Sequence, residues 1–163
     1  GIAGLTLVIV RNDLLALAPE TLPPILRYRT HATAGSLFNT PPVFSIYIAG
    51  LVLQWLAEQG GLDQIDAHNR QQASRLYDRI DTSTLFSSFV EGRDRSQMNV
   101  TFSAGTAVRD DHFLAACADA GLVGLKGHRS VGGLRASLYN ALPNAAMDRL
   151  LNVIDEFEAN PQR

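Results

Sequence analysis

The chain has 163 residues, of which 46% are hydrophobic and 18% are charged, and its formal net charge is −2. This length suffices for one globular core and part of a second. A near-neutral chain lacks the basic field by which proteins attract nucleic acid. The most apolar run, residues 43–56, is too short and too interrupted to span a bilayer. We therefore expect neither nucleic acid nor a membrane as a partner.

The first 42 residues are predicted to hold one strand, one helical turn and a long loop. Residues 5–10 are apolar and β-branched, which is typical of a strand buried on both faces. A short capped helical turn follows at residues 11–15, and residues 28–42 are expected to form a long irregular loop of a kind that is often functional. A buried strand so close to residue 1, without a starting methionine, suggests a piece of a longer chain.

Two helices are predicted next. Residues 43–59 have helical apolar spacing and end at a pair of glycines, Gly60 and Gly61. Phe44 and Trp55 lie on the apolar stripe of this helix, so we expect both in the core. A second helix, with a polar face, is expected over residues 62–80.

The remainder of the chain alternates between strands and helices. The predicted elements are strands at 85–91 and 97–103, a helix at 110–120, strands at 122–125 and 136–140, and a closing helix at 144–158. The order indicates an α+β domain, with helices packed on a mixed or antiparallel sheet. Cys117, the single cysteine, lies in the helix at 110–120, where we expect a buried and unreactive thiol. A lone cysteine excludes an internal disulfide and is typical of a reducing compartment, so we expect a cytoplasmic protein.

The most informative segment is residues 126–135, with the sequence Lys-Gly-His-Arg-Ser-Val-Gly-Gly-Leu-Arg. Arg129 and Arg135 flank the two glycines, and His128 lies beside the first arginine. A guanidinium is a permanent forked donor that matches carboxylate and phosphate oxygens, and glycines let a backbone approach a ligand closely. The segment predicts an anion-binding loop, with ordinary surface salt bridges as the alternative.

A second polar group precedes the helix at 43–59. Asn39 and Thr40 stand directly before two prolines, which hold the backbone extended. Thr40 is a candidate N-cap of the helix. Alternatively, these polar side chains near a helix N-terminus hold a phosphate.

Other reactive constellations are weak. His31, His68 and His112 have no paired ligands at metal-binding spacing, so no metal site is predicted. Ser130 and Ser137 lack the His and Asp pattern of a hydrolase triad.

Residues 38–42 (Phe-Asn-Thr-Pro-Pro), residues 46–52 and above all residues 126–141 resemble the phosphoserine aminotransferase family. These are class V, fold-type I enzymes that depend on pyridoxal 5′-phosphate, and the resemblance extends over essentially the whole chain. It implies that residues 1–42 are a remnant of the large cofactor-binding domain, residues 43–60 an interdomain helix, and residues 61–163 the C-terminal small domain.

The resemblance also implies roles for single residues. Arg135 would bind the α-carboxylate of the substrate, while His128 and Arg129 would bind the phosphate of phosphoserine or the side-chain carboxylate of glutamate. Asn39 and Thr40 would reach across a homodimer to the cofactor phosphate of the other subunit. The parent reaction would transfer an amino group from glutamate to 3-phosphohydroxypyruvate, giving phosphoserine and 2-oxoglutarate for serine biosynthesis, and in many bacteria would also serve pyridoxine biosynthesis.

One departure from the family concerns catalysis. The family's cofactor-binding lysine is expected just upstream of Gly1, and the single lysine of this chain, Lys126, belongs to the anion loop. We therefore name no catalytic residue and expect the chain alone to be inactive. The alternatives are another class V aminotransferase or a desulfurase, or a non-catalytic anion-binding or dimerisation module.

Overall fold

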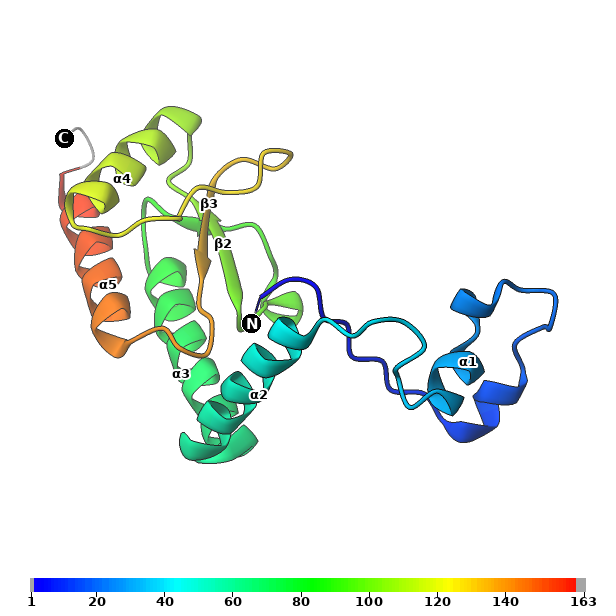
Figure 1. The fold of residues 1–163 in the computed structure, drawn as a ribbon. Coiled ribbons are helices and arrows are strands. Elements are labelled where there is room, and N and C mark those ends of the chain that lie inside the picture. Colours follow the sequence, from blue (N-terminus) through cyan, green and yellow to red (C-terminus); the bar gives the residue numbers. More distant parts are fainter. Residues whose placement is uncertain (1, 161–163) are drawn as a thin grey trace. The chain divides into compact units, whose positions relative to one another are not determined.

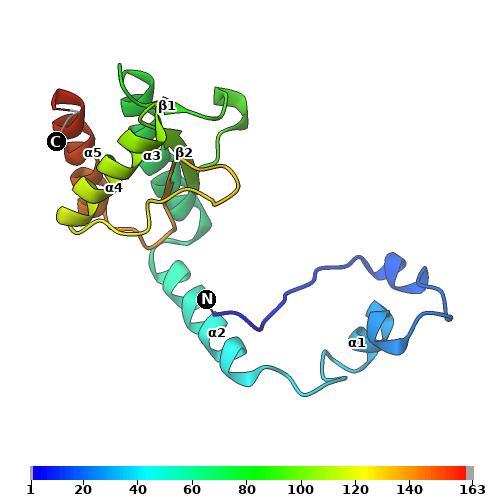
Figure 2. The same ribbon diagram turned by 90° about the horizontal axis from the view of Figure 1, so that it is seen from above.

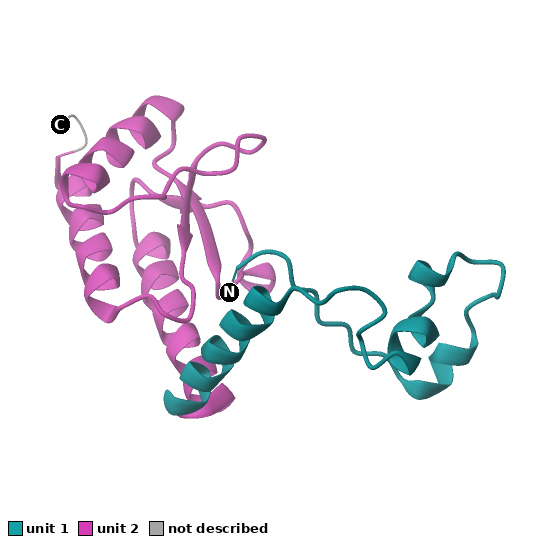
Figure 3. Ribbon diagram, in the orientation of Figure 1, with its two compact units in different colours: residues 1–59 teal, residues 60–163 magenta. Residues whose placement is uncertain are grey.

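The computed structural model describes residues 2–160. The chain divides into two compact units, Gly1–Gln59 and Gly60–Arg163, which are coloured separately in Figure 3.

The first unit consists of short helical segments joined by extended chain. Its elements are the 3₁₀ turns η1 (Asn12–Ala16) and η2 (Pro24–Leu26) and the helices α1 (Tyr28–Thr33) and α2 (Val43–Glu58). Figure 1 shows them in blue to cyan. The predicted helical turn at residues 11–15 is confirmed as η1, but no side chain makes the predicted capping hydrogen bond there. The predicted helix at 43–59 is confirmed as α2.

The predicted buried strand at residues 5–10 is wrong. These residues pair with no strand among residues 2–160, and the side chains of Leu7 and Ile9 are 84% and 91% exposed. An apolar sequence alone does not make a strand, because the backbone N–H and C=O groups need a neighbouring strand to bond.

The predicted irregular loop at residues 28–42 is wrong in its first half, which forms α1. Two side chains hold this helix to the proline-containing segment before it. The Nε of Arg27 donates to the carbonyl of Leu22 at 2.6 Å, and Nε2 of His31 lies 2.8 Å from the carbonyl of Ile25. These contacts join residues five and six positions apart, and they depend on how the chain folds back at the prolines, which helix and loop signals in the sequence do not indicate.

Helix α2 has apolar side chains on all sides and no buried residue. Phe44 is 67% exposed and Trp55 is half-buried, so the prediction that both lie in the core is wrong for Phe44 and only partly right for Trp55. The first unit has too few elements to surround such a helix. No helix among residues 2–160 combines the length and apolar character needed to cross a membrane.

The second unit is an antiparallel sheet with helices packed against it. Its elements are α3 (Gly61–Asp81), β1 (Ser87–Ser88), η3 (Gly92–Asp94), β2 (Asn99–Ser103), α4 (Ala107–Asp119), β3 (Leu134–Ser137) and α5 (Asn144–Ala159). The strand order is β1-β2-β3, with both pairs antiparallel. Figures 1 and 2 show the three helices gathered on one side of the sheet.

The predicted strand at residues 122–125 is wrong. A single isolated bridge joins Lys126 to Leu134, and the amide of Arg135 donates to the carbonyl of Leu125 at 2.7 Å. Gly124 has φ of 80°, a left-handed conformation that bends the segment away from regular pairing.

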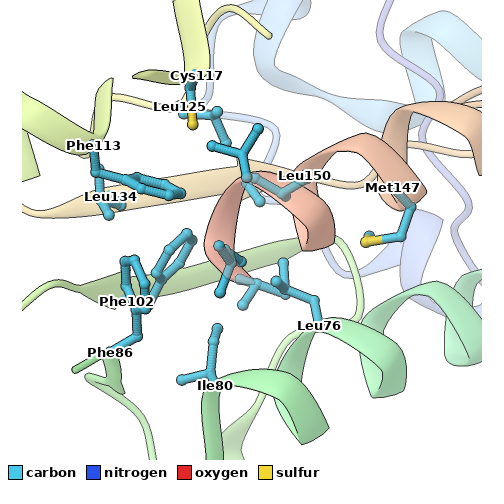
Figure 4. Close-up of a cluster of buried hydrophobic side chains, with 14 of the residues drawn as sticks. Leu76, Ile80, Phe86, Phe102, Phe113, Cys117, Leu125, Leu134, Met147 and Leu150 are labelled. Atoms are coloured by element: carbon cyan, nitrogen blue, oxygen red, sulfur yellow. The ribbon is translucent and has the colours of Figure 1, made fainter. Parts of the chain in front are cut away.

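The core lies between the sheet and the three helices. Figure 4 shows part of it, including Phe86, Phe102 and Phe113, whose rings meet edge to face. Along β2 and β3 buried residues alternate with half-buried ones, so one face of the sheet meets the helices and the other carries polar side chains. Cys117 is fully buried, as predicted, and burial raises the pKa of its thiol to about 12.

Candidate functional site

Arg135 lies on the polar face of the sheet, in β3. Its position pairs with Thr101 of β2, while its chain neighbours Leu134 and Ala136 face the core. The sequence placed Arg135 in a loop before a strand at 136–140, whereas the strand begins at Leu134. A strand position fixes the direction of this side chain better than a loop position would.

The Nε of Arg135 is buried and has no hydrogen-bond partner among residues 2–160. Buried polar groups in native proteins are nearly always paired, and leaving a charged donor unpaired is costly. Six of the twelve arginines among residues 2–160 form ion pairs, and Arg129 and Arg135 belong to the six that form none. The ordinary salt-bridge alternative therefore finds no support here, and Arg135 is suited to an acceptor that a ligand supplies.

The loop between Lys126 and β3 is closed by backbone contact. The amide of Gly127 donates to the carbonyl of Gly133 at 2.9 Å, and the amides of Val131 and Gly132 donate to the carbonyl of His128 at 2.9 and 2.8 Å. This loop, residues 127–133, is called the anion loop below. In Figures 1 and 2 it is the gold loop that extends from the sheet on the side away from α5.

The glycines at the base of the anion loop are required by this close approach. A Cβ on Gly127 would lie 2.0 Å from the carbonyl oxygen of Gly132. Gly133 has φ of 66°, and a Cβ there would lie 2.6 Å from the ring of Phe89. No side chain fits either position without moving the loop.

His128 and Arg129 are both exposed at the tip of the anion loop. The Nδ1 of His128 lies 2.7 Å from Oγ of Ser130 and accepts a hydrogen bond from the Ser130 amide at 3.3 Å. The structure thus places His128, Arg129 and Arg135 on one loop and the strand that follows it. Sequence reasoning singled out these three, considered Ser130 only as a hydrolase nucleophile and missed Phe89, since neither serine nor phenylalanine is diagnostic of an anion site.

Asn39 and Thr40 belong to the first unit, where both are exposed. The prediction that Thr40 caps the helix is wrong. The N-cap position is Pro42, and no side chain makes a capping hydrogen bond there. The two prolines place Thr40 outside the reach of the first helical turn, so its side chain remains available to another group.

No group of three His, Cys, Asp or Glu side chains that could hold a metal ion occurs within the described part of the chain.

Residues 1–150 match the family model described as aminotransferase class-V. The chain belongs to the class-V aminotransferase family.

Curated relatives carry the name phosphoserine aminotransferase. The protein of Burkholderia lata is 49% identical over 158 residues, which are 97% of this chain and 44% of that protein. The protein of Lactiplantibacillus plantarum is 51% identical over 160 residues, with 98% and 44% covered. The chain thus spans less than half the length of these relatives.

Solved structures agree with this relationship. Phosphoserine aminotransferase from Bacillus circulans subsp. alkalophilus superposes with a TM-score of 0.87 at 45% identity, covering 92% of this chain and 42% of that one. A pyridoxal-phosphate-bound phosphoserine aminotransferase from Trichomonas vaginalis gives 0.77 at 36% identity, covering 84% and 39%. The predicted fold class, α+β with helices on an antiparallel sheet as in part of a fold-type I enzyme, is confirmed, as is the predicted resemblance.

Proposed function

We propose that the chain is the C-terminal portion of a phosphoserine aminotransferase. The complete enzyme transfers an amino group between glutamate and 3-phosphohydroxypyruvate, giving O-phosphoserine and 2-oxoglutarate. This reaction serves serine biosynthesis and, with a related phosphorylated oxo-acid, pyridoxine biosynthesis. The half-buried side chain of Arg135, which forms no ion pair among residues 2–160 and whose Nε is unpaired there, carries the proposal, because a guanidinium without a protein partner beside the anion loop is suited to an anionic ligand.

The two ends of the substrate are assigned to different residues. Arg135 binds the α-carboxylate that phosphoserine and glutamate share. This contact is the same for both substrates, and a strand position suits it because the strand fixes the direction of the side chain. His128 and Arg129 bind the distal phosphate of phosphoserine or the side-chain carboxylate of glutamate. Both are exposed at the loop tip and neither forms an ion pair within residues 2–160, so they are available to two anions of different shape.

The described residues suit one end of pyridoxal 5′-phosphate. Asn39 and Thr40 have exposed polar side chains just before α2, a 16-residue helix whose N-terminus has no capping side chain. Amide, hydroxyl and helix N-terminal N–H groups are typical phosphate ligands. We assign both residues to the cofactor phosphate of the other subunit in a homodimer. When bound, the cofactor supplies the electron sink for the amino-transfer chemistry.

The chain's single lysine does not suit covalent attachment of the cofactor. The backbone of Lys126 forms an isolated β-bridge with Leu134 at the base of the anion loop, within the segment that we assign to substrate binding. Catalysis of amino transfer needs an amine nucleophile at the cofactor. We therefore assign binding and orientation to this chain and no catalytic residue, and we propose that it is inactive alone.

The domain boundaries are also proposed. Residues 1–42 belong to the large cofactor-binding domain, residues 43–60 form an interdomain helix, and residues 61–163 form the small domain. The change of compact unit between Gln59 and Gly60 supports the second boundary. We place the enzyme in the cytoplasm, in keeping with a single free thiol.

One observation bears on the desulfurase alternative. A class V desulfurase needs an accessible nucleophilic thiol, and Cys117 is buried with a raised pKa of about 12. A non-catalytic anion-binding module would use the same loop without turnover.

A chimera tests the proposal. Residues 1–163 would replace the matching segment of the Burkholderia lata phosphoserine aminotransferase. We expect glutamate-dependent conversion of 3-phosphohydroxypyruvate, with Arg129→Ala raising KM for phosphoserine far more than KM for an unphosphorylated amino acid. A folded, cofactor-loaded chimera without this turnover would contradict the proposal. If the chimera does not fold, titration of the isotope-labelled 163-residue chain with O-phosphoserine decides, since loop amides that do not respond would equally contradict it.

A further inference from the structure

Ser130 makes two contacts with the same atom of His128. Its hydroxyl Oγ lies 2.7 Å from Nδ1, and its backbone N–H donates to Nδ1 at 3.3 Å. The loop turn keeps the two residues in this position, since the carbonyl of His128 accepts from the amides of Val131 and Gly132. The amide of Ser130 takes no part in the hydrogen bonds of this turn and donates to the His128 ring instead.

The backbone contact determines where the proton of the neutral ring lies. An N–H group has no lone pair, so it can only donate, and Nδ1 must be the acceptor. A neutral imidazole carries one proton, which is then on Nε2. The hydrogen bond made by one ring nitrogen thus determines what the other nitrogen offers.

The Ser130 hydroxyl can also bond Nδ1 when the His128 ring is charged. When His128 is protonated, Nδ1 becomes a donor, and Oγ of Ser130 at 2.7 Å is an acceptor for it. Ser130 therefore occupies Nδ1 in both charge states. In each state Nε2–H is the ring donor left for a ligand.

We infer that Ser130 is a positioning residue for the distal anion: it holds the His128 ring so that Nε2–H, and not Nδ1, is offered to phosphate or carboxylate. The inference rests on the proposed function for the identity of that anion. It assigns Ser130 no contact with the substrate. Arg129, between the two residues in sequence, supplies the second cationic group at the same loop tip.

The geometry is tested on the 163-residue chain itself, independently of activity. Two-bond ¹⁵N–¹H spectra at alkaline pH report which imidazole nitrogen is protonated, and His128→Gln identifies the signals among the four histidines. We expect Nε2 protonated and Nδ1 as a hydrogen-bonded acceptor. In Ser130→Ala the Nδ1 signal should move toward that of an unbonded nitrogen. A neutral ring protonated on Nδ1 would overturn the inference.

Titration with inorganic phosphate tests which nitrogen is offered. The signal of Nε2 should move more than that of Nδ1, and this response should be smaller in Ser130→Ala. Ser130→Thr, which keeps the hydroxyl, should restore it. Equal responses in the wild-type chain and Ser130→Ala would overturn the inference.

Kinetics of the chimera separate positioning from a general structural role. Ser130→Ala should raise KM for phosphoserine about three- to tenfold, the effect of one lost hydrogen bond, with kcat within about twofold. Ser130→Thr should recover most of the loss. Ser74→Ala, an exposed serine on α3, is the matched control and should change neither constant.

The outcomes distinguish this inference from the proposed function. A folded wild-type chimera without phosphoserine turnover would refute the proposed function, while the tautomer and the phosphate titration would still decide the role of Ser130. Normal turnover with an unchanged KM in Ser130→Ala would refute the inference alone.

Discussion

Phe89 lies against Gly133, and the contact joins the segment after β1 to the base of the anion loop. The space where a side chain of Gly133 would begin is occupied by the Phe89 ring, 2.6 Å from the Cβ position. The amide of Phe89 donates to the carbonyl of Thr101, whose partner in β3 is Arg135. Phe89, Thr101 and Arg135 thus lie side by side across the sheet, and the Phe89 ring also contacts the base of the anion loop.

We expect Gly133→Ala to destabilise the second unit by about 1–3 kcal/mol, because φ of 66° is strained for alanine and its Cβ also lies 2.9 Å from the carbonyl oxygen of Phe102. Urea unfolding measures the loss. In a Phe89→Ala background part of the cost should disappear, since the ring is gone. Gly92→Ala, which meets no atom within 4 Å, is the control. Equal costs in both backgrounds would show that the ring does not constrain the loop.

Arg135→Leu should separate stability from function. Removing a half-buried side chain whose buried Nε has no partner among residues 2–160 should leave the free energy of unfolding unchanged or up to about 1 kcal/mol higher. In the chimera, kcat/KM for phosphoserine should fall at least about a hundredfold, because the α-carboxylate that we assign to Arg135 would lose its forked donor. Arg93→Gln, with its side chain 82% exposed, should change neither quantity. A large loss of stability in Arg135→Leu would mean that Arg135 is structural.

Glu158 should make the stability of the second unit pH-dependent. Burial opposes its ionisation, but hydrogen bonds from Arg79, Ser83 and Thr84 outweigh burial and lower the pKa to about 2 from 4.5. Since the folded pKa is the lower one, this stabilisation is complete above the unfolded pKa and is lost as pH falls from about 5 toward 2.

Glu158→Gln tests this dependence by urea unfolding at neutral and acidic pH. The variant should lose about 1–3 kcal/mol at neutral pH and show a shallower decline in acid. Glu156→Gln, an exposed neighbour on the same helix, should behave as the wild type. Parallel pH curves for Glu158→Gln and the wild type would contradict the prediction.

Cys117 should be unreactive in the folded chain. Its thiol is buried and its pKa is raised to about 12 by burial, so little thiolate exists at neutral pH. A colorimetric thiol reagent should label it only after unfolding. Rapid labelling of the native chain would reopen the desulfurase alternative.

The 163-residue chain should not transaminate without a complementing lysine-bearing segment. A spectrophotometric assay with glutamate, 3-phosphohydroxypyruvate and pyridoxal phosphate should show no turnover above the protein-free rate. Turnover by the purified chain that is abolished in Lys126→Arg would contradict the assignment of Lys126 to the anion loop.

The second unit could be predicted from sequence in most of its elements. Helices α3, α4 and α5 have clear periodicity and end signals, and each lies within a few residues of its predicted range. The conformation of residues 5–10 could not be predicted, because apolar side chains favour burial but do not show whether a neighbouring strand is present to pair with. Arg135 was found by residue type, but its strand position depends on pairing with Thr101, a contact 34 positions away in sequence.

The base of the anion loop, at Gly127 and Gly133, limits which of its positions can change during evolution. At Gly127 and Gly133 backbone meets backbone or an aromatic ring, so these positions admit no side chain and tolerate little substitution. Residues 128–131 lie beyond the base of the loop, where no such close contact excludes a side chain. With the roles proposed above, substitutions at the loop tip would change the binding of the distal group while the strand that carries Arg135 stays in register. The same fold could then change its preferred substrate and keep the proposed contact with the α-carboxylate.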